Sequence, residues 1–356
     1  MKILHVSQGL EQTSGISAFL VENANRQANA GHEVALLYER ILEYRPSKFV
    51  RVYKRKTPFG IDLRPDVVHI HGVWSLFSAY AMLWCIIKHI PFIVSPHGCL
   101  MPRVFLRGML KKKLFYHLLI APLMKKAAIV HVTASHESEA VRALGFCRQL
   151  EIIPLGVAGA VMPKVGKGQN LHLMLFVGRI SEEKGLVNLL RAWRQTKHEG
   201  WRLMLAGPDW KGYRDVLNEE VARLELLDEV LFPGTVVGDA KDELYSHADC
   251  FVLPSPMENF SAVVLEALAH GLPVIATKGT PWREIEECSC GWWIDQGLEP
   301  LVEALQAAVD KTDEGRREMG KRGVALAQSR YSWDLISRQT LVMYERVVDA
   351  GNKENG

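Results

Sequence analysis

Short apolar runs alternate with segments of helical periodicity along almost all of the 356 residues, and this alternation restricts the fold most strongly. The runs are apolar throughout rather than at every second position, which is typical of strands buried on both faces of a parallel sheet. Strands that alternate with helices in this way form doubly wound α/β domains. At about 100–200 residues per domain, the length predicts two such domains.

The pattern occurs twice, once in each half of the chain. Strands are predicted at Lys2–Ser7, Glu33–Tyr38, Asp66–His71, Pro91–Ser95, Ile129–Thr133 and Glu151–Ile153, and again at Leu171–Val177, Arg202–Ala206, Val230–Phe232, Cys250–Leu253, Pro273–Ala276 and Gly291–Ile294. Helices are predicted at Ile16–Ala30, Gly185–Thr196, Tyr213–Leu226, Asp242–Ser246, Ala262–His270, Pro300–Lys311 and Tyr331–Val348. The Gly- and Pro-rich segment 154–170 has no periodicity and indicates a linker. We therefore expect one domain at 1–160, a second at 161–330 and a final helix within 331–356.

The charge is distributed unevenly between the two halves. Residues 1–160 carry 20 basic and 10 acidic side chains, a surplus of +10, whereas the remainder carries −7. No Asp or Glu occurs from Val67 through His136, where eight Lys or Arg are found. This asymmetry suggests that the first half meets an anionic partner.

Cysteine spacing and hydropathy predict a cytoplasmic protein. The six cysteines lack the C-x2-C spacing of a zinc site, and in a chain this large we expect reduced thiols. The first residues lead directly into an apolar strand, without the architecture of a signal peptide. The long uncharged stretch Val67–Ile87 contains His69, His71 and Gly72, which favours a strand followed by an amphipathic segment over a membrane-spanning helix.

The usual nucleotide and metal signatures are missing, and a cation pair stands in their place. The sequence has no G-x-G-x-x-G after a strand, no G-x-x-x-x-G-K-[ST], no D-x-D and no H-E-x-x-H, so we expect no protein-held catalytic metal. In the loop GRISEEKG at 178–185, Arg179 and Lys184 follow the carboxyl end of a strand. There they can hold a diphosphate in place of Mg²⁺. An ordinary solvated surface loop is the alternative.

A second cluster surrounds the start of the predicted helix Ala262–His270. Backbone N–H groups near Phe260 and Ser261 form a helix N-terminus, which attracts anions. Glu266 lies about 7.5 Å farther along the helix axis, a distance that suits ribose hydroxyls beyond a diphosphate. Glu258 precedes the helix on the side where a hexose would lie. The alternative assigns both carboxylates to structural roles at the helix entry and on an exposed helix face.

A third cluster combines a glycine with a histidine in the first half. Gly15 lies in the first strand-to-helix turn, and His97 follows the predicted strand Pro91–Ser95. Both are expected at the carboxyl edge of the first sheet, where open α/β sheets bind ligands. Glycine lets the backbone approach a phosphate, and a histidine can donate a hydrogen bond to one. A purely structural histidine is the alternative.

These motifs resemble those of the retaining glycosyltransferases of the GT-B fold, in particular family 4, over nearly the full length. The resemblance is carried by GRISEEKG at 178–185 and by ENFSAVVLE from Glu258 to Glu266, which continues as ALAHGLPVIAT. GHEV at 31–34, DVVHIHG at 66–72 and SPHG at 95–98 support it. The chain departs from the family at Asn259-Phe260-Ser261, where many members have G-F-G, and the larger side chains are expected to narrow the hexose pocket. Trp282 is expected to shape the donor or acceptor site.

The resemblance implies two Rossmann-like, doubly wound parallel-sheet domains that face a cleft, with the final helix crossing back to the first domain. It also implies transfer of a hexose from a UDP- or GDP-linked sugar with retention of configuration, without a metal or another cofactor. Arg179 and Lys184 would stabilise the departing diphosphate, Glu266 would bind ribose and Glu258 the hexose, and His97 would lie near the anomeric carbon. The implied catalytic residues are His97, Glu258, Arg179 and Lys184. The implied donor-binding residues are Gly15, Arg179, Lys184, Glu258, Asn259, Phe260, Ser261 and Glu266.

Two other classes of protein share this scaffold: an epimerase or phosphorylase, and a non-catalytic carbohydrate-binding module. Retention of Arg179, Lys184 and Glu258 argues against the non-catalytic module. The basic run 103–126 interleaves cations with apolar side chains, which favours a helix in a membrane interface over a solvated face, and no motif supports nucleic-acid binding. We therefore expect a cytoplasmic enzyme on the inner face of the membrane, with a polyprenyl-diphosphate-linked glycan acceptor, in bacterial surface-polysaccharide synthesis.

Overall fold

The computed structural model describes residues 1–11, 15–40, 43, 45–58, 63–102, 104, 109–145, 149–159 and 171–355. Contacts divide the chain into two compact units, one of Met1–Gly156 with Trp333–Gly356 and one of Val157–Ser332. The last helix therefore belongs to the first unit, although it follows the second in sequence. Most of the predicted linker, residues 160–170, lies outside the described residues.

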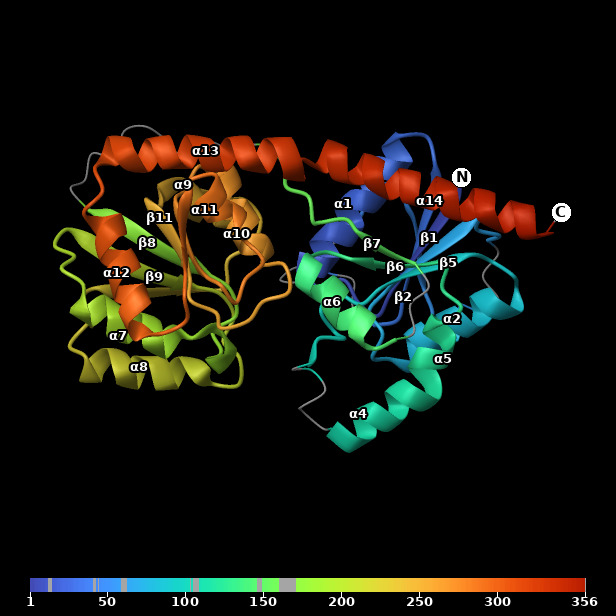
Figure 1. The fold of residues 1–356 in the computed structure, drawn as a ribbon, viewed down its shortest axis with the longest axis horizontal. Coiled ribbons are helices and arrows are strands. Elements are labelled where there is room, and N and C mark those ends of the chain that lie inside the picture. The colour runs from blue at the N-terminus through green and yellow to red at the C-terminus, as the bar shows by residue number, and fades with distance from the viewer. Residues whose placement is uncertain are drawn as a thin grey trace. The chain divides into compact units, whose positions relative to one another are not determined.

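The first unit contains a parallel sheet of seven strands (Figure 1). The strands are β1 (Lys2–Ser7), β2 (Glu33–Tyr38), β3 (Arg51–Lys54), β4 (Val67–His71), β5 (Phe92–Ser95), β6 (Ile129–Val132) and β7 (Leu150–Ile152). Their order is β3-β2-β1-β4-β5-β6-β7. Consecutive side chains of the central strands are buried, as their continuous apolar runs predict. The strand order reverses between β1 and β4: the strands that follow β1 in sequence, β2 and β3, lie toward one edge of the sheet, and those that follow β4 lie toward the other.

Helices cover both faces of this sheet (Figure 1). They are α1 (Gly15–Asn29), α2 (Leu76–Ile87), α4 (Met109–Phe115), the π-helix η1 (Tyr116–Ile120), α5 (Ala121–Met124), α6 (Ser135–Ala143) and α14 (Trp333–Asn355). Helix α14 contacts α1 and β4, whereas α2 contacts α5. No helix in the described ranges combines the length and apolarity needed to cross a bilayer.

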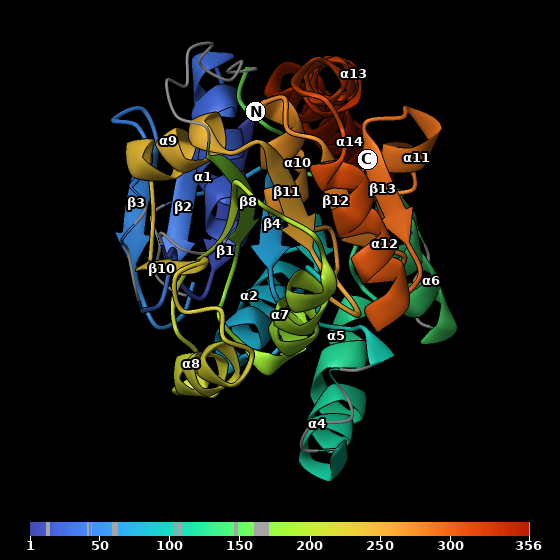
Figure 2. The ribbon, with the colours of Figure 1, turned by 90° about the vertical axis from the view of Figure 1, so that its left-hand side faces the viewer.

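The second unit contains a parallel sheet of six strands with the same switched order. The strands are β8 (His172–Val177), β9 (Trp201–Ala206), β10 (Val230–Gly234), β11 (Cys250–Leu253), β12 (Val274–Thr277) and β13 (Gly291–Ile294). Their order is β10-β9-β8-β11-β12-β13, and Figure 2 shows β8, β11, β12 and β13 side by side. Its helices are η2 (Glu182–Lys184), α7 (Leu186–Gln195), α8 (Tyr213–Arg223), α9 (Asp239–His247), α10 (Ala262–Ala269), α11 (Glu284–Glu287), α12 (Leu298–Val309) and α13 (Asp313–Tyr331).

Several elements were not predicted, among them strand β3 and the helices α6, α11 and α13. Strand β3 is short, polar and mostly exposed at the sheet edge, so it has no apolar run. Helix α13 contains three glycines, which argue against a helix on propensity alone. A side chain at Gly320 would come within 1.9 Å of the carbonyl oxygen of Gly271, so glycine is required there by close packing. Helix α9 also begins three residues before its predicted start.

Candidate active site

The sequence-predicted donor loops meet at the switch point of the second sheet. Strands β8 and β11 are adjacent and parallel, so the loops that follow them leave at the same edge. Gly185 ends the first loop with φ +69°, and a side chain there would come within 2.7 Å of the carbonyl oxygen of Pro254 in the second loop. The glycine therefore serves both the left-handed turn and the close approach of the two loops.

Lys184 and Glu258 form an ion pair across these two loops. The Lys184 Nζ atom lies 2.5 Å from Glu258 Oε1, and only 16% and 15% of the two side chains are exposed. The backbone N–H of Glu258 also donates to the carbonyl of Gly279, 2.9 Å away, which connects the loop to the end of β12. The pair is shielded enough from water to hold a defined geometry. The sequence predicted both residues at the site but not their contact.

Arg179 packs on an aromatic ring that sequence reasoning missed. Its guanidinium carbon lies 5.0 Å from the ring centroid of Trp210, which is itself half exposed. The backbone around Ile180 pairs with Asp209, so the loop after β8 is joined to the loop after β9. Stacking of this kind fixes the plane of a guanidinium while leaving its N–H edge available. Trp210 lacked a signal because it lies 31 residues from Arg179, in a loop without a motif.

The start of α10 lies beside this pair. Asn259 and Phe260 lead into Ser261, the N-cap residue, whose φ of +66° is in the left-handed region. Trp282 was expected to shape the donor or acceptor site; its side chain is only 1% exposed, so it does not line either site directly. Its Nε1–H instead donates to the carbonyl of Phe260 over 2.6 Å. Trp282 thus holds the turn before α10, and its effect on the shape of the site stays a prediction.

Glu266, on α10, makes polar contacts with two residues of α9. Its carboxylate accepts a hydrogen bond of 2.8 Å from the Tyr245 hydroxyl and pairs with Lys241, whose Nζ lies 2.6 Å away. Burial and the adjacent carboxylate raise the pKa of Tyr245 well above its usual value, so the phenol stays protonated as a donor. Less than a third of the Glu266 side chain is exposed. The sequence missed Lys241 because it lies before the predicted start of α9.

In the first unit, Gly15 and His97 lie where the sequence placed them, at the carboxyl edge of the sheet. Gly15 is the first residue of α1. His97 follows β5 in a turn with φ +51°, an uncommon conformation for a non-glycine residue. The buried Glu137 carboxylate holds this turn by accepting from the backbone N–H groups of Gly98 and Thr133.

Comparisons with known proteins agree with this geometry. Residues 160–325 match the model "Glycosyl transferases group 1", and residues 14–156 match "Glycosyl transferase 4-like domain". Residues 160–325 thus form a group 1 glycosyltransferase domain. It is 31% identical over 188 residues to an uncharacterized glycosyltransferase of Methanocaldococcus jannaschii, covering 51% of this chain and 46% of the relative. It is 26% identical over 182 residues to the lipopolysaccharide 1,2-N-acetylglucosaminetransferase of Salmonella typhimurium, covering 48% and 47%.

The chain thus spans about half the length of these curated relatives. Among solved structures, Anabaena HepE in complex with UDP and glucose matches 97% of this chain and 100% of its own, with a TM-score of 0.77 at 18% identity. That likeness concerns the fold, and the two parallel-sheet α/β domains are those of a GT-B glycosyltransferase.

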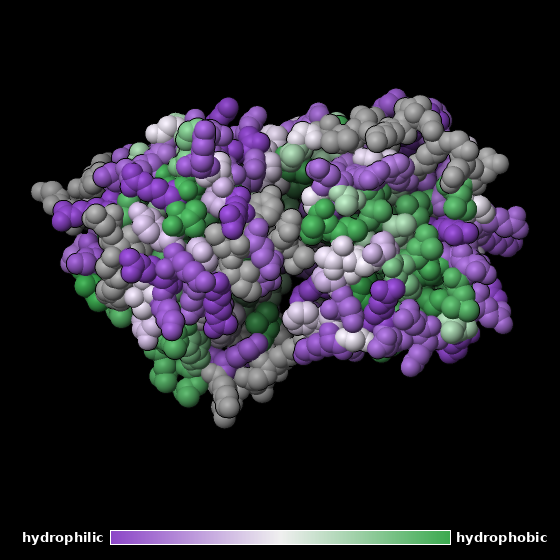
Figure 3. Space-filling model, turned by 180° about the vertical axis from the view of Figure 1, so that it is seen from behind, coloured by the Kyte–Doolittle hydropathy of each residue, from purple (hydrophilic) through white to green (hydrophobic). Residues whose placement is uncertain are grey.

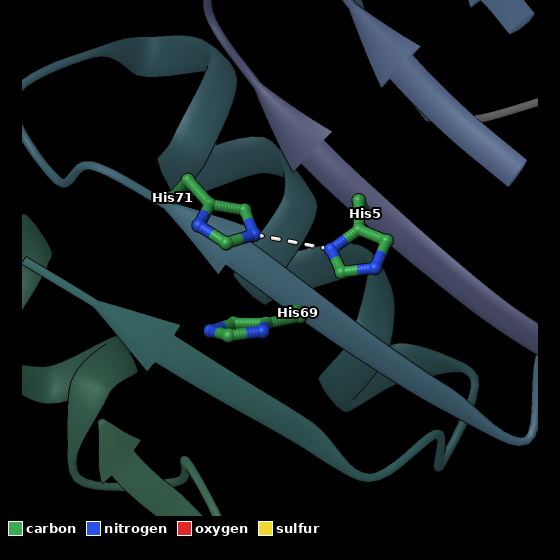
Figure 4. Close-up of side chains that lie close together, drawn as sticks. All are labelled: His5, His69 and His71. Carbon is green, nitrogen blue, oxygen red and sulfur yellow. Dashed lines mark hydrogen bonds between the residues drawn. The ribbon is translucent and has the colours of Figure 1, made fainter. Parts of the chain in front are cut away.

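The chain also has a cluster of buried histidines in its first unit (Figure 4). His5, His69 and His71 each offer a ring nitrogen, and these atoms lie within 4.8 Å of one another, as in metal sites. Every one of their six ring nitrogens already has a hydrogen-bond partner, the shared His5–His71 bond of 3.1 Å included. A metal would have to displace several of these bonds. The sequence signal was the spacing of His69 and His71 on one face of β4.

The first unit also has a cavity of about 330 Å³ at its own switch point. The lining comes from the loop after β1, the start of α1 and the loop after β4, and includes Gly9, Ser17, His71, Gly72 and Trp74. Ligands of open α/β sheets bind at this place.

Of the basic run 103–126, Arg103 and Arg107 lie outside the described residues, whereas Lys112, Lys113, Lys125 and Lys126 are described.

Proposed function

We propose that this enzyme transfers a hexose from a UDP- or GDP-linked sugar to a glycan acceptor, with retention of configuration and without a metal ion. The observation that supports this most directly is the convergence of Arg179, Lys184 and the start of α10 at one switch point. Two cations and a helix N-terminus together offer what a departing diphosphate needs: positive charge and N–H donors.

The donor-binding roles are assigned by position along this edge. Arg179 and Lys184 bind the diphosphate, together with backbone N–H groups at Phe260 and Ser261. Glu266, on α10, accepts hydrogen bonds from the ribose hydroxyls. Glu258 and Asn259 complete this part of the donor site, with Glu258 binding the hexose hydroxyls.

The Lys184–Glu258 pair suggests how binding and chemistry are linked. In the structure the two charges satisfy each other at 2.5 Å. A diphosphate would compete for the lysine, and a hexose hydroxyl would donate to the carboxylate. The chemistry then consists of stabilising the negative charge that develops as the glycosidic bond to the phosphate breaks. The leaving phosphate oxygen can take the proton of the acceptor hydroxyl, so no separate strong base is needed.

A thermal-shift panel of nucleotide sugars tests donor binding. The correct donor at 100 times its Kd should stabilise the native state by about 2.7 kcal/mol. The variant Lys184→Met should lose most of this shift, whereas Lys278→Met should keep it, because Lys278 forms an exposed pair with Asp295. The donor role fails if no UDP- or GDP-sugar shifts the melting temperature, or if both variants respond alike.

We further propose that the first unit binds the inner face of the cytoplasmic membrane and that the acceptor is a polyprenyl-diphosphate-linked glycan of surface-polysaccharide synthesis. The support is an exposed apolar stripe on α2: Leu76, Tyr80, Leu83 and Ile87 recur at intervals of four, three and four residues, and each is 39–56% exposed. Residues at this spacing share one helix face. Leu114 and Leu118 add exposed apolar surface on α4 and η1. Figure 3 shows apolar side chains at the surface in the region of α2 and α4.

Cations flank both ends of this stripe. Lys112 lines a pocket with Leu76 and lies 5.8 Å from the centroid of the Trp74 ring. At the other end of α2, Lys125 and Lys126 line a cavity with Ile86. No acidic residue occurs in the sequence between Val67 and His136, so the segment that carries α2 and these lysines contributes only positive charge. An anionic lipid surface fits this combination, and each cation near it contributes about 1 kcal/mol.

A further inference from the structure

A chain of hydrogen bonds begins at a backbone carbonyl of α14 and enters the first sheet. The Thr340 hydroxyl donates to the carbonyl of Ile336 over 2.8 Å, so its oxygen is left as an acceptor. The Asn23 amide donates to that oxygen at 3.5 Å, and the Gln27 amide donates to Asn23 at 3.4 Å. Because a carbonyl can only accept, the direction of every bond in this series is set at its first member. The carbonyl oxygen of Gln27 is therefore the acceptor that faces the histidines.

The same direction continues through three histidines. His5 Nε2 lies 2.8 Å from that Gln27 oxygen and must carry the hydrogen. His5 Nδ1 is then a lone pair, which accepts from His71 Nε2 at 3.1 Å. His71 Nδ1 is a lone pair in turn, which accepts from His97 Nε2 at 3.0 Å. The series thus fixes the tautomer of His97 with its hydrogen on Nε2 and a lone pair on Nδ1.

A second series has the same direction and an independent anchor. His131 Nε2 donates to the backbone carbonyl of Ile153 over 2.9 Å, so His131 Nδ1 accepts from the Ser95 hydroxyl at 2.7 Å. Ser95 Oγ then accepts from His69 Nε2, and His69 Nδ1 accepts from the Tyr344 hydroxyl, both at 2.6 Å. Each histidine in both series carries its hydrogen on Nε2.

We propose that His71, held by His5 and Gln27, is a positioning residue that fixes the tautomer of His97, so that His97 Nδ1 accepts a hydrogen bond from a sugar hydroxyl of the substrate. The role of His97 at the reacting sugar rests on the proposed function. From the sequence, His97 was predicted to donate to a phosphate. The hydrogen-bonded series Gln27–His5–His71–His97, here called the relay, instead leaves His97 Nδ1 as an acceptor. Its partner is therefore a hydroxyl group rather than a phosphate oxygen. No partner for His97 Nδ1 is found among the residues that the structure describes.

The surroundings favour neutral rings. Burial lowers the pKa of His5 to about 4, and burial together with His131 lowers that of His97 to about 3. Burial also lowers the pKa of His131 to about 4. For His69 and His71, burial and the neighbouring histidines together lower the pKa well below its usual value. Among the described residues, the other ionisable groups at the cluster are the Tyr344 phenol and the Glu137 carboxylate, which accepts from Gly98 and Thr133. Glu11, Arg40 and Cys99 line the cavity that His71 also lines. Neutral rings preserve the relay, because each must keep one lone pair.

Nitrogen-15 NMR of the histidine rings tests the relay directly, because it distinguishes the two neutral tautomers and the cation. We expect His97 in the wild-type chain to carry its hydrogen on Nε2 at every pH from 8 to 5.5. In His71→Leu the acceptor is lost, and His97 should become a mixture of tautomers. In His71→Asn the amide oxygen occupies the place of Nδ1, and the single tautomer should return. His71→Gln, whose amide occupies the place of Nε2, should behave like His71→Leu.

Kinetics gives the functional readout. His71→Gln should lower kcat about tenfold, the equivalent of one hydrogen bond, with the donor KM unchanged, and His71→Asn should restore most of it. The proposal is overturned if wild-type His97 carries its hydrogen on Nδ1, or if its tautomer is unchanged in His71→Leu. The wild-type spectrum alone tests the first point, even if a variant does not fold. Because the spectra need no turnover, a chain with the relay but no transferase activity refutes the proposed function alone.

Discussion

At the scale of single residues, the two glutamates that begin and end the motif ENFSAVVLE have different partners, so their substitution should have different effects. Glu258 pairs with Lys184 beside the first loop, and Glu266 pairs with Lys241 and Tyr245 on the α9 side of α10. The first contact couples a carboxylate to the cation assigned to the diphosphate. The second holds a carboxylate at a fixed distance from the helix N-terminus.

Glu266→Gln should weaken nucleotide binding, because the neutral amide loses a charged hydrogen bond worth roughly 1.5–3 kcal/mol, about ten- to hundredfold in Kd. Glu258→Gln should chiefly lower turnover or change the preferred sugar. Calorimetric titration of the nucleoside diphosphate and steady-state kinetics measure the two effects. Asp295→Asn, in an exposed pair, is the control. Unchanged nucleotide affinity in Glu266→Gln would remove that residue from the ribose role.

Ser261 is predicted to store backbone strain. Its φ of +66° costs a non-glycine residue about 1–2 kcal/mol. A glycine avoids this cost but loses about 0.5–1 kcal/mol more conformational entropy on folding. Ser261→Gly should therefore raise the free energy of unfolding by about 0.5–1 kcal/mol. Ser332→Gly, at φ −62°, offers no such relief and should lower it. Urea unfolding compares them, and a loss of stability in Ser261→Gly contradicts the strain.

At the scale of elements, continuous apolar strands and periodic helices could be predicted. A strand buried on both faces has a continuous apolar run, and a helix buried on one face has apolar residues at helical spacing. Strand β3 and helix α13 could not, because a polar edge strand and close glycine packing leave no such mark. The donor loops were predictable from short motifs. The contacts of Arg179 with Trp210, Glu266 with Lys241, and His5 with His71 were not, because each joins segments at least 25 residues apart that only the folded sheets bring together.

Membrane contact is a prediction for α2 and α4. Sedimentation with anionic liposomes should fall steeply with salt, and changing Lys111, Lys112 and Lys113 to Glu should abolish it. Leu83→Glu should weaken it without removing a cation, because the residue is part of the exposed stripe on α2. The same triple reversal at Arg317, Lys321 and Arg322 on α13 is the control. Binding that ignored both salt and these changes would leave a soluble acceptor as the better proposal.

At the scale of the whole molecule, the buried histidines should make stability depend on pH. The folded-state pKa values of His5 and His131 are lowered to about 4, so below the unfolded value of about 6.5 the unfolded chain binds more protons. The contribution of these neutral histidines to the free energy of unfolding is therefore complete above pH 6.5. It falls by about 1.4 kcal/mol per pH unit for each such histidine as the pH decreases toward 4. Urea unfolding between pH 7.5 and 5 should show this slope. His131→Gln should flatten it, whereas the exposed His247→Gln should not.

The most direct measurement is the hydrolysis of a panel of UDP- and GDP-sugars by the whole chain in excess EDTA, with water as the acceptor. The released nucleoside diphosphate is quantified, and the initial anomeric configuration of the released sugar is followed by proton NMR. We expect release at an undiminished rate, retention of configuration for the preferred donor, and loss of release in Lys184→Met but not in Lys278→Met. Activity that vanished in EDTA and returned with Mg²⁺ or Mn²⁺, or a product of inverted configuration, would contradict it.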